Sequence, residues 1–154
     1  MYQPVLYASV VIAFIYVATV IVKIYKTDSG DAKMVEISDL IRVGANTFLM
    51  KEYSFLSIFV VAVAALLYFV IGTNMSIAFV IGALCSALAG FIGMRIATIA
   101  NVKTANAAKT SLNKALQVAF SSGTVLSFSV VGLGLLGIIS LYDAFHDLDA
   151  LFGF

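Results

Sequence analysis

Three stretches of this sequence contain no charged residue: 1–22, 53–94 and 115–142. An α-helix rises about 1.5 Å per residue, so about 20 apolar residues cross the hydrocarbon core of a bilayer. The middle stretch is long enough for two crossings, and it contains the turn-forming sequence Gly72-Thr73-Asn74. The sequence therefore predicts an all-α membrane protein with four transmembrane helices, at about residues 4–23, 53–71, 75–95 and 119–142.

The composition supports the same class of protein. Of the 154 residues, 62% are hydrophobic and 11% are charged, whereas a soluble domain has about 25% charged residues. A chain with so few charges cannot cover a surface that faces water, so we expect an integral, multi-pass membrane protein whose main partner is the lipid bilayer. The net charge is +1, and the basic residues are too scattered to follow a phosphate backbone. We therefore expect no nucleic acid partner.

Two polar segments separate the predicted spans. Residues 33–52 repeat apolar side chains at three- and four-residue steps, which indicates an amphipathic helix. Residues 95–116 carry basic residues and no carboxylate, and their alanine, lysine and leucine content favours helix. All nine lysines and arginines lie in the first and third connections between spans. Because basic residues concentrate on the cytoplasmic side of a membrane, both segments are predicted to be cytoplasmic and both termini to lie outside.

Small residues predict where the helices pack. Gly82, Ser86 and Gly90 are spaced four apart, which places them on one helical face where backbones can approach closely in lipid. The fourth span contains a second such set, with two further glycines as close-packing positions: Gly123, Ser127 and Gly134, then Gly132 and Gly137. The single cysteine, Cys85, lies within an apolar run, and we interpret it as a packing residue.

No group of residues indicates catalysis. Ala108-Lys109-Thr110 lacks the preceding glycines of a phosphate-binding loop. His146 lies in a tail with Asp143, Asp147 and Asp149, which we interpret as a solvated cap rather than a metal site. The cytoplasmic carboxylates are spread over a turn, a surface helix and the start of a span: Asp28, Asp31, Glu36, Asp39 and Glu52. Ion pathways are marked by charged groups inside spans, and the predicted spans contain none apart from Lys23 and Arg95 at their ends. We therefore assign no catalytic, cofactor-binding or metal residue to this chain.

Three segments carry a family resemblance. Residues 36–53 include Ile41-x-x-Gly44-Ala45-x-x-Phe48-Leu49-x-x-Glu52-Tyr53, and residues 130–137 read Val-Val-Gly-Leu-Gly-Leu-Leu-Gly. The longest segment is Gly82-x-x-x-Ser86-x-x-Ala89-Gly90-x-Ile92-Gly93-Met94-x-x-Ala97-Thr98-x-Ala100-Asn101-Val102-Lys103-Thr104-Ala105-x-Ala107-Ala108. Together they resemble the membrane-bound, ion-pumping pyrophosphatases, in family order and over most of residues 33–142.

The resemblance implies a larger protein than this sequence. The four helices are similar to the first four helices of the family, which lie in the outer ring of a larger helical bundle. The resemblance also implies a homodimer, and an inner ring that binds inorganic pyrophosphate with Mg²⁺ and moves protons or sodium ions. On this reading the chain is an N-terminal, packing portion of an inorganic pyrophosphatase and ion translocase, inactive alone and associated with the remaining helices of the pump.

The sequence departs from the family pattern at two cytoplasmic positions. Ile99 stands where the family usually has arginine, and Lys103 replaces the more usual arginine. The alternative interpretation is a self-contained four-helix membrane scaffold or accessory subunit. A stop codon soon after Phe154 in the gene would favour that alternative, and an open reading frame continuing to aspartate-rich loops would favour the pump. Nothing in these residues distinguishes proton from sodium transport or indicates potassium dependence.

Overall fold

The computed structural model describes residues 3–146 and 148–154 and contains helices and connecting turns, with no strand among the described residues. The helices are α1 (Gln3–Lys26), α2 (Ala32–Val70), α3 (Thr73–Ala108), α4 (Leu112–Phe145) and the short α5 (Leu148–Leu151). Helices α1 to α4 are each long and apolar enough to cross a membrane. The predicted all-α class with four membrane-spanning helices is therefore confirmed, while the predicted depth of each span in the bilayer stays a prediction.

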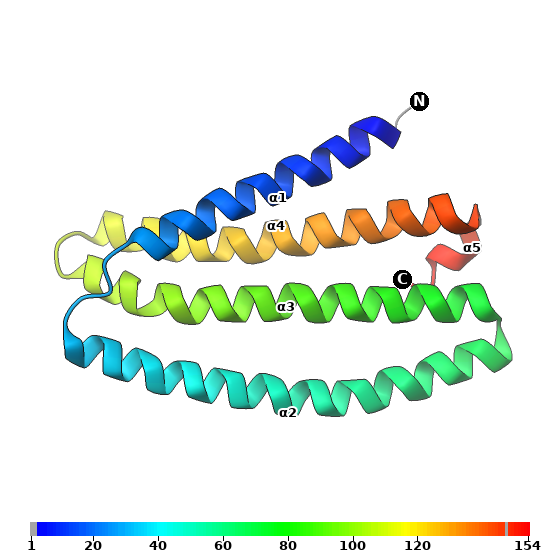
Figure 1. Cartoon of the computed structure of the whole chain (residues 1–154), viewed down its shortest axis with the longest axis horizontal. Coiled ribbons are helices and arrows are strands. Elements are labelled where there is room, and N and C mark those ends of the chain that lie inside the picture. Colours follow the sequence, from blue (N-terminus) through cyan, green and yellow to red (C-terminus); the bar gives the residue numbers. More distant parts are fainter. Residues whose placement is uncertain (1–2, 147) are drawn as a thin grey trace.

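The four long helices lie side by side in an open layer, in the spatial order α1, α4, α3, α2 (Figure 1). Helix α3 packs against both α2 and α4, and α1 packs mainly against α4. Among the described residues α1 and α2 make no contact with each other, so the layer does not close into a bundle. The α1–α2 and α3–α4 connections lie at one end of the layer, and the α2–α3 turn lies at the other (Figure 1).

Helix α2 joins two segments that the sequence analysis treated separately. The predicted amphipathic segment, residues 33–52, and the predicted second span, residues 53–71, form one helix of 39 residues. Asp31 begins it, because its side chain accepts a hydrogen bond from the Met34 amide at 3.0 Å and so caps the free N–H groups of the first turn. Gly72 has φ +143° and turns the chain directly into α3, which confirms the predicted turn between the two crossings.

Helices α3 and α4 meet along a seam that includes Gly93 and Leu126, and each of the two helices also carries buried positions with a seven-residue repeat. On α4 the buried or half-buried positions advance in alternating steps of three and four: Ala115, Val118, Ser122, Val125, Ser129, Gly132, Leu136 and Ile139. On α3 six of the ten buried positions fit the same repeat: Gly82, Ala89, Gly93, Ile96, Ala100 and Lys103. A 3.5-residue period keeps one stripe facing the neighbouring helix over many turns, as in coiled coils. Small residues on this stripe let the two backbones approach closely.

The predicted small-residue faces are only partly correct. Gly82 is buried and Gly90 is half-buried, but Ser86 between them is exposed. The reason is that α3 has neighbours on different faces: Gly90 lies toward Tyr53 of α2, whereas Gly93 lies against Leu126 of α4. The second set is also wrong as a face packed within this chain. A Cβ on Gly123 or Gly134 would meet nothing within 4 Å, and Ser127 is exposed. The glycines of α4 that lie in contact are Gly132, beside the Phe14 ring, and Gly137, beside the Phe154 ring.

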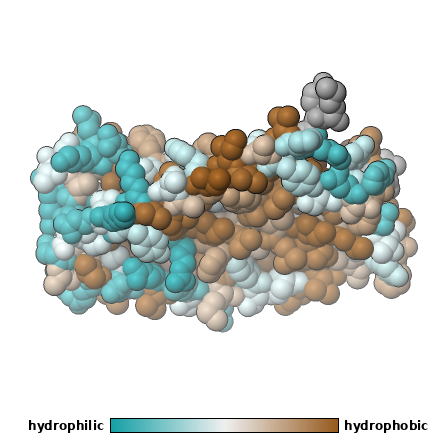
Figure 2. All heavy atoms as spheres, turned by 45° about the horizontal axis from the view of Figure 1, so that its top comes forward, coloured by the Kyte–Doolittle hydropathy of each residue, from teal (hydrophilic) through white to brown (hydrophobic). Residues whose placement is uncertain are grey.

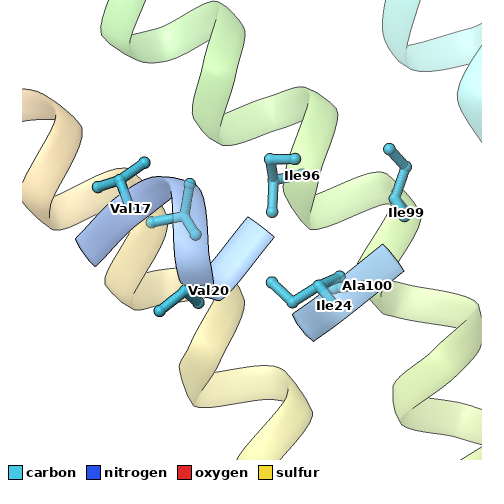
Figure 3. Close-up of a cluster of buried hydrophobic side chains, with 7 residues drawn as sticks. Val17, Val20, Ile24, Ile96, Ile99 and Ala100 are labelled. Atoms are coloured by element: carbon cyan, nitrogen blue, oxygen red, sulfur yellow. The ribbon is translucent and has the colours of Figure 1, made fainter. Parts of the chain in front are cut away.

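The largest apolar cluster lies where α1 meets α3 and α4 (Figure 3). Val17, Val20 and Ile24 of α1 contact α3 and Val125 of α4, which is fully buried. Ile99, at a position where the resemblance leads one to expect arginine, is 8% exposed and belongs to this cluster. An apolar side chain here removes surface from water without leaving a buried charge that needs a partner.

The surface divides into a hydrophilic end and an apolar band. Figure 2 shows hydrophilic side chains gathered at the end that carries the α1–α2 and α3–α4 connections, with apolar side chains covering the middle. Many large apolar side chains of α2 are exposed, among them Phe55, Ile58, Val61 and Phe69, at 69% to 84%. A soluble monomer rarely exposes such a continuous apolar surface. In a bilayer the same apolar side chains face lipid hydrocarbon instead of water, which is favourable for them.

Candidate functional site

The polar end of the layer is held together by side chains at three-residue steps on α3. Lys103 and Asn106 lie in the last turns of that helix, Lys109 is its C-cap residue, and all three contact the α1–α2 connection. We call these three residues, with Asp28 and Asp31 of the connection, the loop clamp. Residues three apart on a helix lie on neighbouring turns of one face. Side chains from that one face can therefore contact the connection at several points.

Lys103 caps the C-terminal end of α1. Its ammonium group donates hydrogen bonds to the main-chain oxygens of Tyr25, at 3.2 Å, and Thr27. The last carbonyl groups of a helix have no hydrogen-bond donor within the helix, and they carry partial negative charge. A buried ammonium group supplies both a hydrogen-bond donor and a positive charge. Lys103 is 6% exposed. It therefore serves as a capping group supplied from a helix distant in sequence.

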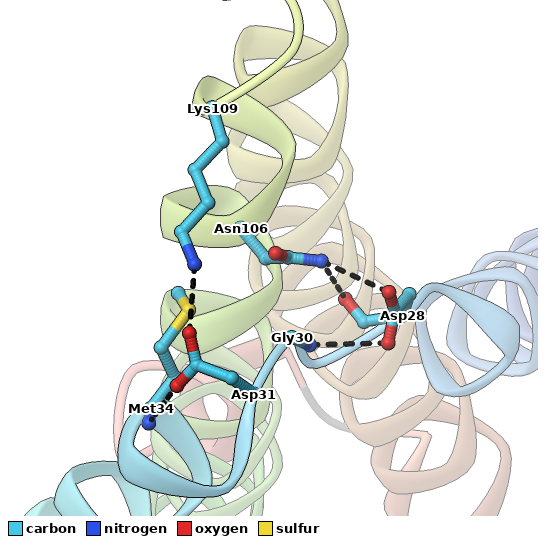
Figure 4. Close-up of polar contacts among 6 residues, drawn as sticks. All are labelled: Asp28, Gly30, Asp31, Met34, Asn106 and Lys109. Atoms are coloured by element: carbon cyan, nitrogen blue, oxygen red, sulfur yellow. Dashed lines mark hydrogen bonds and ion pairs between the residues drawn. The ribbon is translucent and has the colours of Figure 1, made fainter.

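Asn106 fixes the middle of the connection (Figure 4). Its amide nitrogen donates to a carboxylate oxygen of Asp28 at 3.1 Å, and the Gly30 amide donates to the other carboxylate oxygen of Asp28 at 3.1 Å. These hydrogen bonds, with that from the Gly30 amide contributing most, lower the pKa of Asp28 from its ordinary value of 3.8. Gly30 has φ +86°, and a Cβ there would overlap Met34 and Asn106. Glycine is therefore required at this point by both backbone and space.

Lys109 fixes the start of α2. Its ammonium group lies 3.0 Å from Asp31 Oδ2, while Asp31 Oδ1 caps α2 through the Met34 amide (Figure 4). The hydrogen bond from Lys109 is the largest cause of a lowered pKa of Asp31, followed by that from the Met34 amide. One carboxylate thus ties the end of α3 to the start of α2.

The carboxylates further along α2 do not converge with these. Glu36 pairs with Lys33 at 2.9 Å, and Asp39 pairs with Arg42 at 3.3 Å, both on the exposed face of α2. Glu52 is exposed further along the same helix. Magnesium bound to pyrophosphate needs several carboxylate oxygens directed at one point. The described residues contain no group of three or more potential metal-ligating side chains. The described carboxylates of the α1–α2 connection and of α2 point to separate places, so they do not fit a magnesium site.

The opposite end of the layer has a smaller polar contact. Asp143 of α4 accepts hydrogen bonds from Gln3 Nε2 at 2.6 Å and from the Tyr7 hydroxyl at 2.8 Å, both on α1. His146 ends α4 in a left-handed conformation, with φ 51°. Asp147 and the side chain of Asp149 lie outside the described residues. Asp143, which the sequence analysis assigned to a solvated tail, therefore also joins α1 to α4.

Two hydrogen bonds between α2 and α3 were missed by sequence reasoning. The Tyr53 hydroxyl donates to the main-chain oxygen of Ala87 at 2.6 Å, and the Ser76 hydroxyl donates to that of Ala64 at 2.8 Å. In lipid no water competes for such groups, so polar side chains between helices hold them together. The only sequence signal was the presence of hydroxyl side chains within apolar runs.

Four apolar helices, polar connections gathered at one end and an apolar band exposed between the ends define a multi-pass integral membrane protein. Residues 11–153 match the sequence profile of the family described as inorganic H+ pyrophosphatase. The chain belongs to this family, as the resemblance at residues 36–53, 82–108 and 130–137 predicted.

Individual relatives agree with that membership. The chain is 40% identical over 133 residues to a K(+)-insensitive pyrophosphate-energized proton pump of Methanosarcina mazei, covering 85% of this chain and 20% of the relative. It is 44% identical over 116 residues to a putative K(+)-stimulated pyrophosphate-energized sodium pump of Clostridium tetani, covering 75% and 17%. A pyrophosphate-energized membrane proton pump of Arabidopsis thaliana is 36% identical over 177 residues, covering 92% and 22%. The chain thus spans about one fifth of the length of the curated relatives it matches.

Proposed function

We propose that this chain is the N-terminal part of a pump that couples hydrolysis of inorganic pyrophosphate to the transport of protons or sodium ions. Within that pump the four helices are a packing layer of the outer ring, and the catalytic site lies in other helices. The observation that carries the proposal is the match of residues 11–153 to a pump family, over only about a fifth of each relative.

The chemistry of the described residues supports a structural role. Pyrophosphate and its magnesium ions need carboxylates and lysines around one cavity. Here Asp28, Asp31, Lys103 and Lys109 are engaged in the hydrogen bonds of the loop clamp, which positions helices. When bound elsewhere in the pump, Mg²⁺ would neutralise the phosphate oxygens of the substrate. On this proposal the described residues of the chain supply no ligand to it.

The open layer supports association with further helices. Among the described helices α2 contacts α3 alone, and the most apolar window of α2 has no buried residue. Such a surface is covered either by lipid or by neighbouring helices. On the proposed function, the partners are the bilayer, the remaining helices of the pump and, as the resemblance implies, a second copy of the pump. The predicted topology, with both termini outside, places the loop clamp in the cytoplasm.

Complementation tests this role. The pump is expressed as two chains, residues 1–154 and the remainder, each alone and both together, in membranes lacking other pyrophosphatases. We expect magnesium-dependent phosphate release only when both chains are present, and copurification of the two chains through a tag on one. A remainder that is stable and fully active without residues 1–154, and that does not retain them, would contradict the proposal.

A further inference from the structure

A pocket beside the loop clamp gathers three basic side chains. It has a volume of about 250 Å³ and lies where the end of α1, the first half of α2 and α3 approach each other. Three of its six lining residues are cationic and none is acidic; the lining is Tyr25, Ser29, Arg42, Arg95, Ile99 and Lys103. Cations enclosing one hollow repel each other unless an anion occupies it, so the pocket has the charge of an anion site.

The three cationic side chains differ in how far their charges and hydrogen-bond donors already have partners within the chain. Lys103 uses hydrogen bonds to Tyr25 and Thr27 and is buried. Arg42 pairs with Asp39 at 3.3 Å, with both side chains about half exposed, which is a weak arrangement that an anion can displace. Arg95 has no carboxylate partner among the described residues, and its guanidinium group lies 5.9 Å from the centroid of the Phe91 ring. The planar guanidinium group with its fork of N–H donors matches a phosphate group.

An apolar track continues from this pocket along α3. Leu84, Leu88 and Phe91 precede Arg95 at helical steps of four, three and four, so all four side chains share one face. The three apolar side chains are exposed, at 65%, 49% and 39%. They lie on a face of α3 that is covered by neither α2 nor α4, since Gly90 meets Tyr53 and Gly93 meets Leu126 on other faces. Among the described helices α1 and α2 make no contact with each other, so neither closes over this track together with the other.

We propose that this pocket binds the phosphate group of an anionic phospholipid, with an acyl chain along Leu84, Leu88 and Phe91. Basic pockets between helices at the cytoplasmic surface are suited to such head groups. The polar end of the layer, where Tyr25 and Arg95 follow directly on apolar runs, is the depth at which a head group lies. A free phosphate ion shares the same chemistry but makes no use of the apolar track.

The test measures binding rather than hydrolysis, so its outcome is independent of the proposed pump activity. The full-length protein is purified into phosphatidylcholine nanodiscs with and without phosphatidylglycerol, and retained phosphatidylglycerol is counted by native mass spectrometry. We expect Arg95→Gln to retain about tenfold less than wild type, since one charge-assisted hydrogen bond corresponds to about that factor in affinity. Arg95→Lys keeps the charge and should retain an intermediate amount. The matched control is Lys33→Gln, which removes the same charge from an exposed site outside the pocket.

A second measurement separates the two sources of phosphate. Thermal unfolding in neutral detergent is followed with added inorganic phosphate and with added short-chain phosphatidylglycerol, for wild type and Leu88→Ala. Stabilisation by the lipid, reduced in Leu88→Ala and absent in Arg95→Gln, is the expected result. Stabilisation by inorganic phosphate alone would contradict the lipid assignment. Equal retention of phosphatidylglycerol by wild type, Arg95→Gln and Lys33→Gln would overturn the site.

Discussion

The ammonium group of Lys103, on α3, lies 3.2 Å from the main-chain oxygen of Tyr25 in the last turn of α1. It caps α1 from a position 78 residues further along the chain. Through Asn106 and Lys109, the same helix also holds the connection and the start of α2. The relative positions of three helices at this end of the layer therefore depend on one face of α3.

Replacing Lys103 tests that dependence. In Lys103→Met the side chain keeps a similar length, but the carbonyl groups of Tyr25 and Thr27 lose their donor. We expect a loss of roughly 1.5–3 kcal/mol of stability, the usual range for hydrogen bonds to a charged group. Thermal unfolding of the detergent-solubilised protein measures it, with Lys114→Met, at an exposed position, as the control. Equal destabilisation by both substitutions would mean that the capping contact contributes nothing.

Gly93 tests the α3–α4 seam. A Cβ there would overlap the Leu126 side chain, so Gly93→Ala should cost about 1–3 kcal/mol by overpacking. The double substitution with Leu126→Ala should recover part of the loss, because the two side chains then no longer compete for space. Gly123→Ala, where a Cβ meets nothing within 4 Å, is the control and should be neutral or stabilising. Gly90→Leu tests a different contact, with Tyr53 of α2. If Gly93→Ala is as stable as wild type, the seam is placed wrongly.

Topology is tested by cysteine labelling after Cys85 has been replaced. Cysteines at Lys33 and Asn113 should react with an impermeant reagent from the cytoplasmic side only, and one at Asn74 from the outside only. All three positions are exposed. Gly30 and Asn106 are unsuitable labelling sites, because a Cβ on Gly30 would overlap its neighbours and Asn106 of α3 holds the connection through Asp28. Reaction of positions 74 and 113 from the same side would contradict a four-span arrangement.

The loop clamp should weaken in acid. The folded-state pKa of Asp31 is below its ordinary value of 3.8, so the carboxylate stabilises the fold fully above that pH and loses this contribution as the pH falls below it. We expect the thermal midpoint of wild type to fall more steeply below about pH 3.8 than that of Asp31→Asn, which has no proton to take up. Glu36→Gln, in an exposed surface pair, should follow the wild-type curve. Parallel curves for wild type and Asp31→Asn would show that the Lys109 contact does not stabilise the protein.

The parts of the fold that could be predicted from the sequence depend on local signals. Uncharged runs of sufficient length predicted the four long helices, and Gly72 predicted the turn between α2 and α3, because apolar length and glycine conformation act within a few residues. The spacing of Gly82, Ser86 and Gly90 also defined a helical face correctly. It could not show which neighbours the face would meet, and Ser86 is exposed because α2 and α4 contact other sides of α3.

The loop clamp could not be predicted because it joins residues distant in sequence. Asp28 and Asp31 had the composition of an ordinary polar turn, and Lys103 and Lys109 that of a solvated basic helix. Only the three-residue step from Lys103 to Asn106 to Lys109 hinted at a shared face. Likewise, the order α1, α4, α3, α2 follows from packing between distant segments rather than from a local pattern.

The central claim is that these four helices are a packing layer and not a catalytic unit. Phosphate release from pyrophosphate and magnesium, measured on residues 1–154 alone in lipid vesicles beside a vesicle ion-flux signal, tests it most directly. We predict no release and no flux above an empty-vesicle control, whereas the chain continued through the remaining helices of the pump should give both. Magnesium-dependent phosphate release by residues 1–154 alone would contradict the account, because it would require a catalytic site among the helices described here.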